Sequence, residues 1–146
     1  AYWAANATMM AQMAEAVGDR TGAERYRALF ARIRTAFNAA YVQTDGRVGN
    51  DSQTGHVLAI RFGLLAPDAV RRSGERLVAD IARRGHHLST GFLGTPHILD
   101  ALAMAGQEST AIGLLLQRSY PSWGYMVDKG ATSMWERWNS DAGDVS

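Results

Sequence analysis

The 146-residue sequence has no cysteine, so it can form no disulfide and offers no thiolate for catalysis or metal binding. Lysine occurs once, at Lys129, and arginine supplies almost all of the positive charge. The formal net charge is only +1, which gives no electrostatic basis for binding nucleic acid. Since no apolar run reaches about 18 residues, we expect no membrane-spanning helix. What remains is the composition of an ordinary globular protein, 47% hydrophobic and 20% charged.

Histidine is also scarce, and its spacing does not suit a metal ion. The four histidines are His56, His86, His87 and His97. None belongs to a pair at i and i+4 with a third ligand nearby, which is the spacing of helical zinc sites. The sequence shows no phosphate-binding P-loop and no recognisable Ser-His-Asp order. We therefore expect no metal and no cofactor.

The length corresponds to one domain with a sizeable core. The sequence starts Ala1-Tyr2-Trp3, with no initiator methionine, at what we expect to be the inside of a helix. No signal peptide is visible. We interpret residues 1–146 as a piece of a longer polypeptide. The compartment stays undetermined, since both a cytoplasmic and a secreted bacterial protein fit.

Helical periodicity runs through most of the chain and predicts six helices. Their expected ranges are 4–17, 21 onward, 53–65, 67–84, 96–106 and 108–118. Thr21-Gly-Ala-Glu24 reads as a capping box at the start of the second helix, and Pro67 suits the first position of the fourth. We expect Met9, Met10 and Met13 to pack in the core. Residues after 118 read as a loop with one short helix or strand.

Six helices joined by short turns form three αα-hairpins, whose first helices begin near residues 3, 53 and 96. A step of roughly 45 residues per hairpin indicates a helical repeat or toroid. The first helix of each pair carries small residues and methionine, and the second is richer in arginine, which predicts an inner ring covered by a solvated outer ring. A plain helical bundle fits the same pattern.

The segment from Tyr120 to Asp141 contains three of the four tryptophans, Trp123, Trp135 and Trp138, with Glu136 between two of them. Aromatic rings cover the C–H faces of a sugar, and a carboxylate handles protons or a developing positive charge, so the pattern suits carbohydrate chemistry. The other interpretation is a buried aromatic turn in which Glu136 is paired with an arginine.

This segment resembles a motif of the bacterial α-L-rhamnosidases. Gly130-Ala-Thr-Ser-Met-Trp-Glu-Arg-Trp138 is similar to that family's "GATT-(I/M)-WERW" stretch. Further stretches that resemble the family, in the same order along the chain, are Ser52-Gln-Thr-Gly-His-Val-Leu-Ala-Ile-Arg-Phe-Gly-Leu-Leu65, Leu88-Ser-Thr-Gly-Phe-Leu-Gly-Thr95 and Tyr120-Pro-Ser-Trp123. Ser133 stands where threonine is commoner, and Gly55 where alanine is usual. Neither departure involves the carboxylate.

The resemblance implies an all-α fold, in which residues 1–146 are about the C-terminal half of an (α/α)6-barrel catalytic domain: a partial toroid of about three hairpins plus a Trp-rich active-site loop. It implies an enzyme that removes terminal α-L-rhamnose from glycosides with inversion, with Glu136 as general base. In that family the general acid is a glutamate from an upstream motif, so the resemblance implies that the acid lies outside residues 1–146. The implied partners are a rhamnose-containing glycoside and the remainder of the parent polypeptide, with self-association of the fragment.

Trp138, Trp135 and Trp123 are the candidate substrate-binding residues. If the segment is extended, side chains alternate, so Trp138 shares the side of Glu136 and Trp135 takes the other. If it is helical, neighbouring side chains diverge by about 100° and the assignment is weaker. We therefore expect Trp138 to be the ring nearest the sugar. Two other functions stay open: a different (α/α)-barrel carbohydrate enzyme such as a lyase or glucosidase, and a non-catalytic helical scaffold or binding module. The scaffold would be favoured by a buried, ion-paired Glu136.

Overall fold

The computed structural model describes residues 1–142, which form seven α-helices and two short 3-10 turns. The helices are α1 (Tyr2–Ala16), α2 (Arg20–Tyr41), α3 (Gln53–Arg61), α4 (Pro67–Arg83), α5 (Ile98–Met104), α6 (Glu108–Leu116) and α7 (Trp123–Asp128), and the 3-10 turns are η1 (Thr95–His97) and η2 (Ser140–Ala142). Within the described residues, extended pairing is confined to one bridge between Val42 and Val48. The all-α prediction is confirmed.

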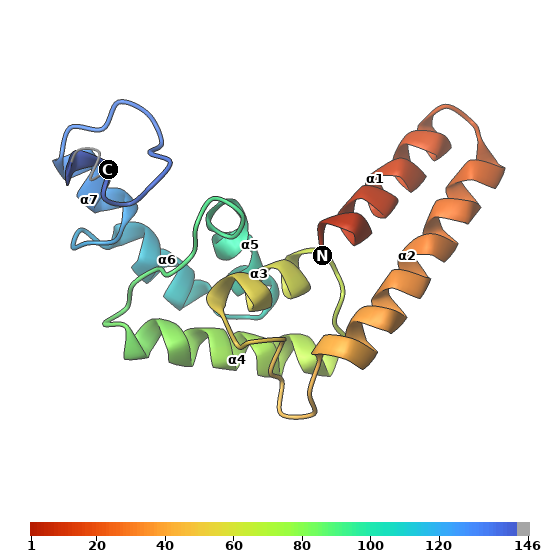
Figure 1. Cartoon of the computed structure of the whole chain (residues 1–146), viewed down its shortest axis with the longest axis horizontal. Helices are drawn as coiled ribbons and strands as arrows, with labels where there is room; N and C mark the ends of the chain where they lie inside the picture. The colour runs from red at the N-terminus through yellow and green to blue at the C-terminus, as the bar shows by residue number, and fades with distance from the viewer. Residues whose placement is uncertain (143–146) are drawn as a thin grey trace.

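The first six helices pack as three successive hairpins: α1 on α2, α3 on α4, and α5 on α6. The first helices of the second and third hairpins, α3 and α5, also pack on each other. The α1–α2 hairpin stands to one side of the other helices, and α7 with the C-terminal segment lies at the opposite end (Figure 1). No helix in residues 1–142 is both long enough and apolar enough to cross a bilayer.

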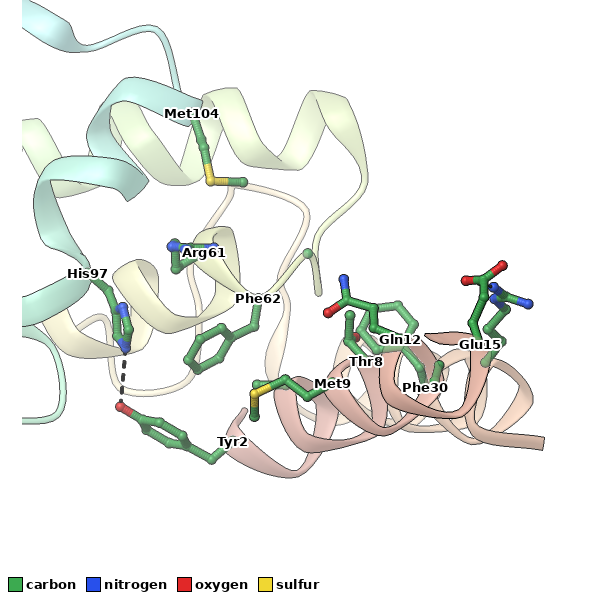
Figure 2. Close-up of a pocket in the computed structure, with 14 residues that line it drawn as sticks. Tyr2, Thr8, Met9, Gln12, Glu15, Phe30, Arg61, Phe62, His97 and Met104 are labelled. Atoms are coloured by element: carbon green, nitrogen blue, oxygen red, sulfur yellow. Dashed lines mark hydrogen bonds and ion pairs between the residues drawn. The ribbon is translucent and has the colours of Figure 1, made fainter. Parts of the chain in front are cut away.

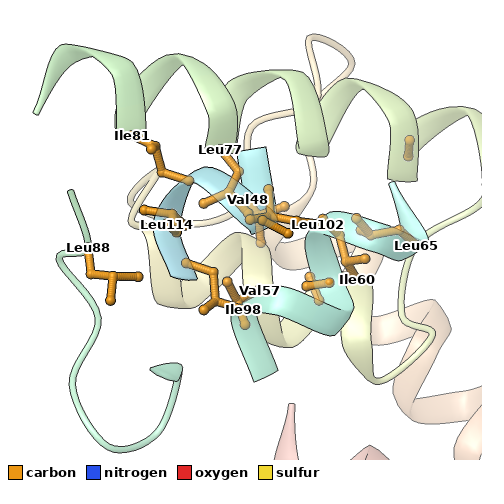
Figure 3. Close-up of a cluster of buried hydrophobic side chains, with 14 residues drawn as sticks. Val48, Val57, Ile60, Leu65, Leu77, Ile81, Leu88, Ile98, Leu102 and Leu114 are labelled. Atoms are coloured by element: carbon orange, nitrogen blue, oxygen red, sulfur yellow. The ribbon is translucent and has the colours of Figure 1, made fainter. Parts of the chain in front are cut away.

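The main core lies among α3, α4, α5 and α6 (Figure 3). Its largest fully buried apolar side chains are Val57, Ile60, Leu77, Ile81, Ile98, Leu102 and Leu114. Each such side chain stabilises the folded state by about 1.5–3 kcal/mol relative to an exposed one. This core fixes the ends of α5 and α6, next to which the Trp-rich segment lies.

The buried face of helix α1 consists of alanines. Its buried residues are Ala4, Ala7, Ala11 and Ala14, which recur at three- and four-residue steps along one face. The larger apolar side chains point away: Trp3, Met9 and Met13 are 64%, 51% and 61% exposed. The expectation that the methionines are core residues is therefore wrong within this chain.

Two predicted helix ends are wrong for local reasons. Helix α2 begins at Arg20 because Asp19, not Thr21, is its N-cap: the Asp19 carboxylate accepts from Gly22 N at 2.8 Å. Helix α3 ends at Arg61, four residues before the predicted end, because Gly63 takes a left-handed φ of 67°. The N–H of Leu64 then bonds the carbonyl of Ala59, which closes the helix in a Schellman turn. Pro67 opens α4, as predicted.

Candidate active site

Helix α7 is followed by residues 129–141, the part of the chain that we call the Trp-rich segment, and this helix anchors the start of that segment. The Ser122 hydroxyl is the N-cap of this helix and accepts from Tyr125 N at 3.0 Å, which places Trp123 at the first helical position. Between Ala131 and Asn139 the chain is neither helix nor strand. The positions of the side chains in that stretch therefore depend on tertiary contacts.

These side chains line a pocket of about 520 Å³. Its wall combines the turn before α5, one residue each of α5, α6 and α7, and the Trp-rich segment. The lining residues are Gly91, Phe92, Thr95, Pro96, Leu99, Leu115, Trp123, Met134, Trp135, Glu136 and Trp138. Among these, Glu136 alone carries a charge. The pocket thus offers one carboxylate in a wall of aromatic and aliphatic groups.

The three candidate tryptophans and Glu136 meet at this pocket. Trp123 and Trp138 pack edge to face, with ring centroids 6.0 Å apart and planes at 78°, and both contact the main core. Trp138 Nε1 donates to the carbonyl of Thr90 at 2.8 Å. Trp135 also lines the pocket. The alternation expected of an extended segment does not apply here, because residues 131–139 form no strand and include bends.

Glu136 is exposed, and among residues 1–142 no arginine, lysine or histidine nitrogen lies within 4.0 Å of its carboxylate. The interpretation of a buried, ion-paired structural glutamate therefore does not hold in this structure. A carboxylate that no cation neutralises keeps its lone pairs available to accept a proton from water.

The neighbouring carboxylates are engaged elsewhere. Asp128 is paired with Arg118. Asp141 accepts from Tyr125 Oη at 2.7 Å and lies 3.8 Å from the ammonium of Lys129. The hydrogen bond to Asp141 raises the pKa of Tyr125. Both aspartates therefore tie α7 to the segments around it, and neither lines the pocket.

A larger cavity of about 970 Å³ separates the α1–α2 hairpin from α3 and α5 (Figure 2). Tyr2, Phe62 and His97 form an aromatic group at one end, and the Tyr2 hydroxyl donates to the carbonyl of Leu93 at 3.0 Å. The one carboxylate in its wall, Glu15, is neutralised by an ion pair with Arg27 at 2.6 Å. The smaller pocket is the better catalytic candidate because, within residues 1–142, no cation is paired with its carboxylate.

Sequence reasoning missed a buried Ser-His-Asp contact. His56 Nδ1 lies 2.7 Å from Ser73 Oγ, and His56 Nε2 lies 2.8 Å from Asp51 Oδ1. Ser73 is fully buried, so no substrate can reach its hydroxyl, and the group is structural. Burial lowers the pKa of His56, and the hydrogen bonds from Arg76 hold the pKa of Asp51 far below its usual range. In residues 1–142 no three potential metal ligands cluster.

Comparison with known proteins agrees with the motifs. Residues 1–146 match the model of the bacterial alpha-L-rhamnosidase 6 hairpin glycosidase domain. The alpha-L-rhamnosidase of Streptomyces avermitilis is 50% identical over 141 residues, which are 96% of this chain and 13% of that protein. An alpha-L-rhamnosidase of Formosa agariphila is 36% identical over 142 residues, 96% of this chain and 15% of that protein.

Solved structures show the same arrangement of helices. The crystal structure of the Streptomyces avermitilis alpha-L-rhamnosidase complexed with L-rhamnose superposes with a TM-score of 0.88 at 47% identity, over 94% of this chain and 13% of that one. The native enzyme from Aspergillus terreus gives 0.87 at 28% identity, over 94% and 16%. The chain spans less than a sixth of the length of the relatives it matches. It belongs to the bacterial α-L-rhamnosidase family and forms part of that family's six-hairpin glycosidase domain.

Proposed function

We propose that this chain is part of an enzyme that removes terminal α-L-rhamnose from glycosides with inversion, and that Glu136 is its general base. The observation that carries the proposal is the exposed, unpaired Glu136 carboxylate in an aromatic pocket. Family membership identifies the substrate class, and a relative at 47% identity has been solved complexed with L-rhamnose.

In this mechanism Glu136 takes a proton from a water molecule, and the water oxygen attacks the anomeric carbon of rhamnose from the face opposite the leaving group. A second carboxylic acid protonates the departing oxygen. Inverting enzymes hold the two carboxyl groups about 6.5–9.5 Å apart to leave room for the water. Since Glu136 is the one ionisable group lining the pocket, the remainder of the parent polypeptide would supply the acid.

The aromatic rings would bind the sugar. Trp123, Trp135 and Trp138 line the wall beside Glu136, where their faces suit the C–H surface of a deoxyhexose. Trp138 is already engaged by its hydrogen bond to the Thr90 carbonyl and by its ring contact with Trp123, so of the two tryptophans that flank Glu136 we favour Trp135 as the sugar-stacking ring.

The remaining hairpins of the ring would cover the two flanks of this chain. One flank is the methionine face of α1, and the other is on α6, where Ile112, Leu115 and Leu116 are 58%, 51% and 71% exposed. Apolar patches of this kind mark surfaces that contact other protein. We therefore propose that the rest of the parent polypeptide covers both faces. Where the rest of the polypeptide is missing, the fragment would associate with itself through these faces.

The test is Glu136→Gln in the intact parent enzyme, assayed on an aryl α-L-rhamnoside beside an aryl β-D-glucoside. Loss of a general base lowers kcat by about 10²–10⁴. Glu24→Gln is the matched control, because Glu24 is an exposed glutamate on α2 outside the pocket. A Glu136→Gln enzyme within about threefold of the wild-type kcat would contradict the assignment. Faster hydrolysis of the glucoside would contradict the substrate class.

A further inference from the structure

Trp138 is held by a part of the chain that lies 48 residues earlier. Its indole N–H donates to the Thr90 carbonyl, and Thr90 is fully buried. On its N-terminal side the Trp-rich segment is tied through Ala131 N–H to the carbonyl of Met126. Glu136 therefore lies in a stretch without regular structure, two residues from the Trp138 anchor.

The Thr90 carbonyl also accepts from Thr95 Oγ1 at 3.3 Å, and the backbone immediately before Thr90 is held by Gln53, the first residue of α3. Gln53 is buried, and its Oε1 accepts from Ser89 N at 2.8 Å while its Nε2 donates to the carbonyl of His87 at 3.2 Å. One amide side chain thus bonds the backbone on both sides of Leu88, immediately before Thr90. A buried amide that uses its acceptor and its donors in this way fixes a loop in one position.

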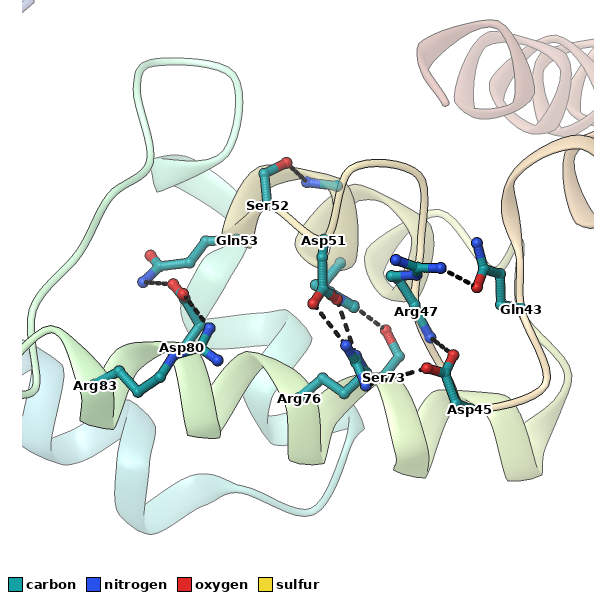
Figure 4. A network of polar contacts seen from close by, with 12 residues as sticks. Gln43, Asp45, Arg47, Asp51, Ser52, Gln53, Ser73, Arg76, Asp80 and Arg83 are labelled. Carbon is teal, nitrogen blue, oxygen red and sulfur yellow. Dashed lines mark hydrogen bonds and ion pairs between the residues drawn. The ribbon is translucent and has the colours of Figure 1, made fainter.

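Gln53 is held in turn by Asp80 on α4 (Figure 4). Asp80 Oδ2 accepts from Gln53 Nε2 at 3.0 Å, and the carboxylate also accepts from Arg83 and Arg84, both at 2.8 Å. Burial favours the neutral acid, but the hydrogen bonds from Arg83, Arg84 and Gln53 outweigh it and keep the pKa of Asp80 below its ordinary value. The carboxylate is therefore ionised, and it orients the amide so that Oε1 faces Ser89.

We propose that Trp138 and Gln53 are positioning residues for Glu136: Gln53 sets the place of segment 87–90, and that segment holds Trp138 through the Thr90 carbonyl. Neither residue carries out the proton transfer. The inference rests on the proposed role of Glu136. Its physical basis is that attack on the anomeric carbon requires an aligned water molecule. Displacing the general base by about 1 Å misaligns this water and lowers kcat substantially.

The experiment compares Trp138→Phe, Gln53→Met and the double variant in the intact parent enzyme. Phenylalanine keeps an aromatic ring and removes the N–H, and methionine keeps the length of glutamine and removes the amide. We expect each single variant to lower kcat for an aryl α-L-rhamnoside by about tenfold while KM stays within about twofold. Because both act through one contact, the double variant should be no slower than the slower single variant.

The matched control is Gln43→Met, at an exposed glutamine outside the pocket that is bonded to Arg47. It should keep the wild-type kcat. Thermal unfolding of each variant shows that the domain is folded, and if Trp138→Phe does not fold, Gln53→Met alone carries the kcat and KM test.

Three results would overturn the inference: wild-type kcat in Trp138→Phe or Gln53→Met, a loss that appears in KM instead of kcat, or single losses that multiply in the double variant. These results are distinct from failure of the proposed function. If Glu136→Gln is inactive while Gln53→Met is fully active, only the positioning role is wrong. If Glu136→Gln is fully active, both are wrong.

Discussion

Asp51→Asn removes one negative charge from the turn that leads into α3, without changing the shape of the side chain. Asp51 has a left-handed φ of 63°, which asparagine also tolerates well. Its carboxylate accepts from Arg76 Nε at 2.9 Å and Nη2 at 2.6 Å, and lies 2.8 Å from His56 Nε2. The substitution therefore isolates the electrostatic part of this contact.

The expected loss is set by the bonds to Arg76. An asparagine oxygen can still accept from His56, but its amide nitrogen then faces the guanidinium. Hydrogen bonds to charged groups stabilise by about 1.5–3 kcal/mol. Arg76 is 33% exposed and has a second carboxylate, Asp45, at 3.4 Å, so part of the loss is recovered. We expect a net destabilisation of about 2 kcal/mol, or about 4–10 °C in Tm for a domain of this size.

The pH dependence of the stability difference between wild type and Asp51→Asn tests this reasoning. Because Arg76 depresses the pKa of Asp51 below its usual 3.8, the carboxylate stabilises the fold fully above that value and loses this effect as the pH falls below it. The difference between wild type and Asp51→Asn should persist from pH 7 down to about pH 4 and shrink progressively below that, over the range that leads down to the strongly depressed pKa of Asp51 in the folded protein. Urea unfolding followed by circular dichroism measures it. A difference that is absent at neutral pH, or that persists undiminished in acid, would refute the reasoning.

His56 gives a second pH effect that both proteins share. Burial lowers its pKa below 6.5, so the unfolded chain binds a proton before the folded chain does. Stability should therefore fall in both proteins as the pH drops below about 6.5, and more steeply in Asp51→Asn, because the Asp51 carboxylate partly offsets the effect of burial on the pKa of His56.

Two further predictions concern packing. Gly74→Ala should destabilise by about 1–3 kcal/mol in thermal unfolding, because the new Cβ would overlap Ala105 Cβ, and this outweighs the better helix propensity of alanine. Adding Ala105→Gly should restore much of the loss, and no rescue would contradict the contact. The isolated 15.9 kDa chain should show no rhamnosidase activity and should self-associate in light scattering, because the apolar faces of α1 and α6 are uncovered. An active, stable monomer would contradict both parts.

The sequence predicts the hairpins well because their signals are local. Pro67 and the periodic apolar positions mark where helices begin and which face they bury. The errors also have local causes. Asp19 and Thr21 both suit an N-cap, and the hydrogen bond from Gly22 N to the Asp19 carboxylate shows which one is used. The apolar run continues past Gly63 into Leu64 and Leu65, so periodicity alone extends α3 too far.

The site is less predictable than the helices. The motif around Glu136 identifies the candidate base through its resemblance to a family, but the direction of Trp135 could not be inferred from a segment without regular structure. Gln53 and Thr90 carry no sequence signal for their contacts with the site, because those contacts join segments that are far apart in the chain. Such positions emerge only when the fold brings α3, the turn before α5 and the Trp-rich segment together.

The central claim is that Glu136 activates the attacking water, and azide rescue of Glu136→Ala in the intact parent enzyme tests it most directly. Removal of the carboxylate leaves space for azide, an anion that needs no base, to attack the anomeric carbon while the general acid protonates the leaving oxygen. The account predicts that azide restores turnover of an aryl α-L-rhamnoside and that NMR identifies the product as β-L-rhamnosyl azide, with inverted configuration. No rescue, or an α-configured azide, would contradict it.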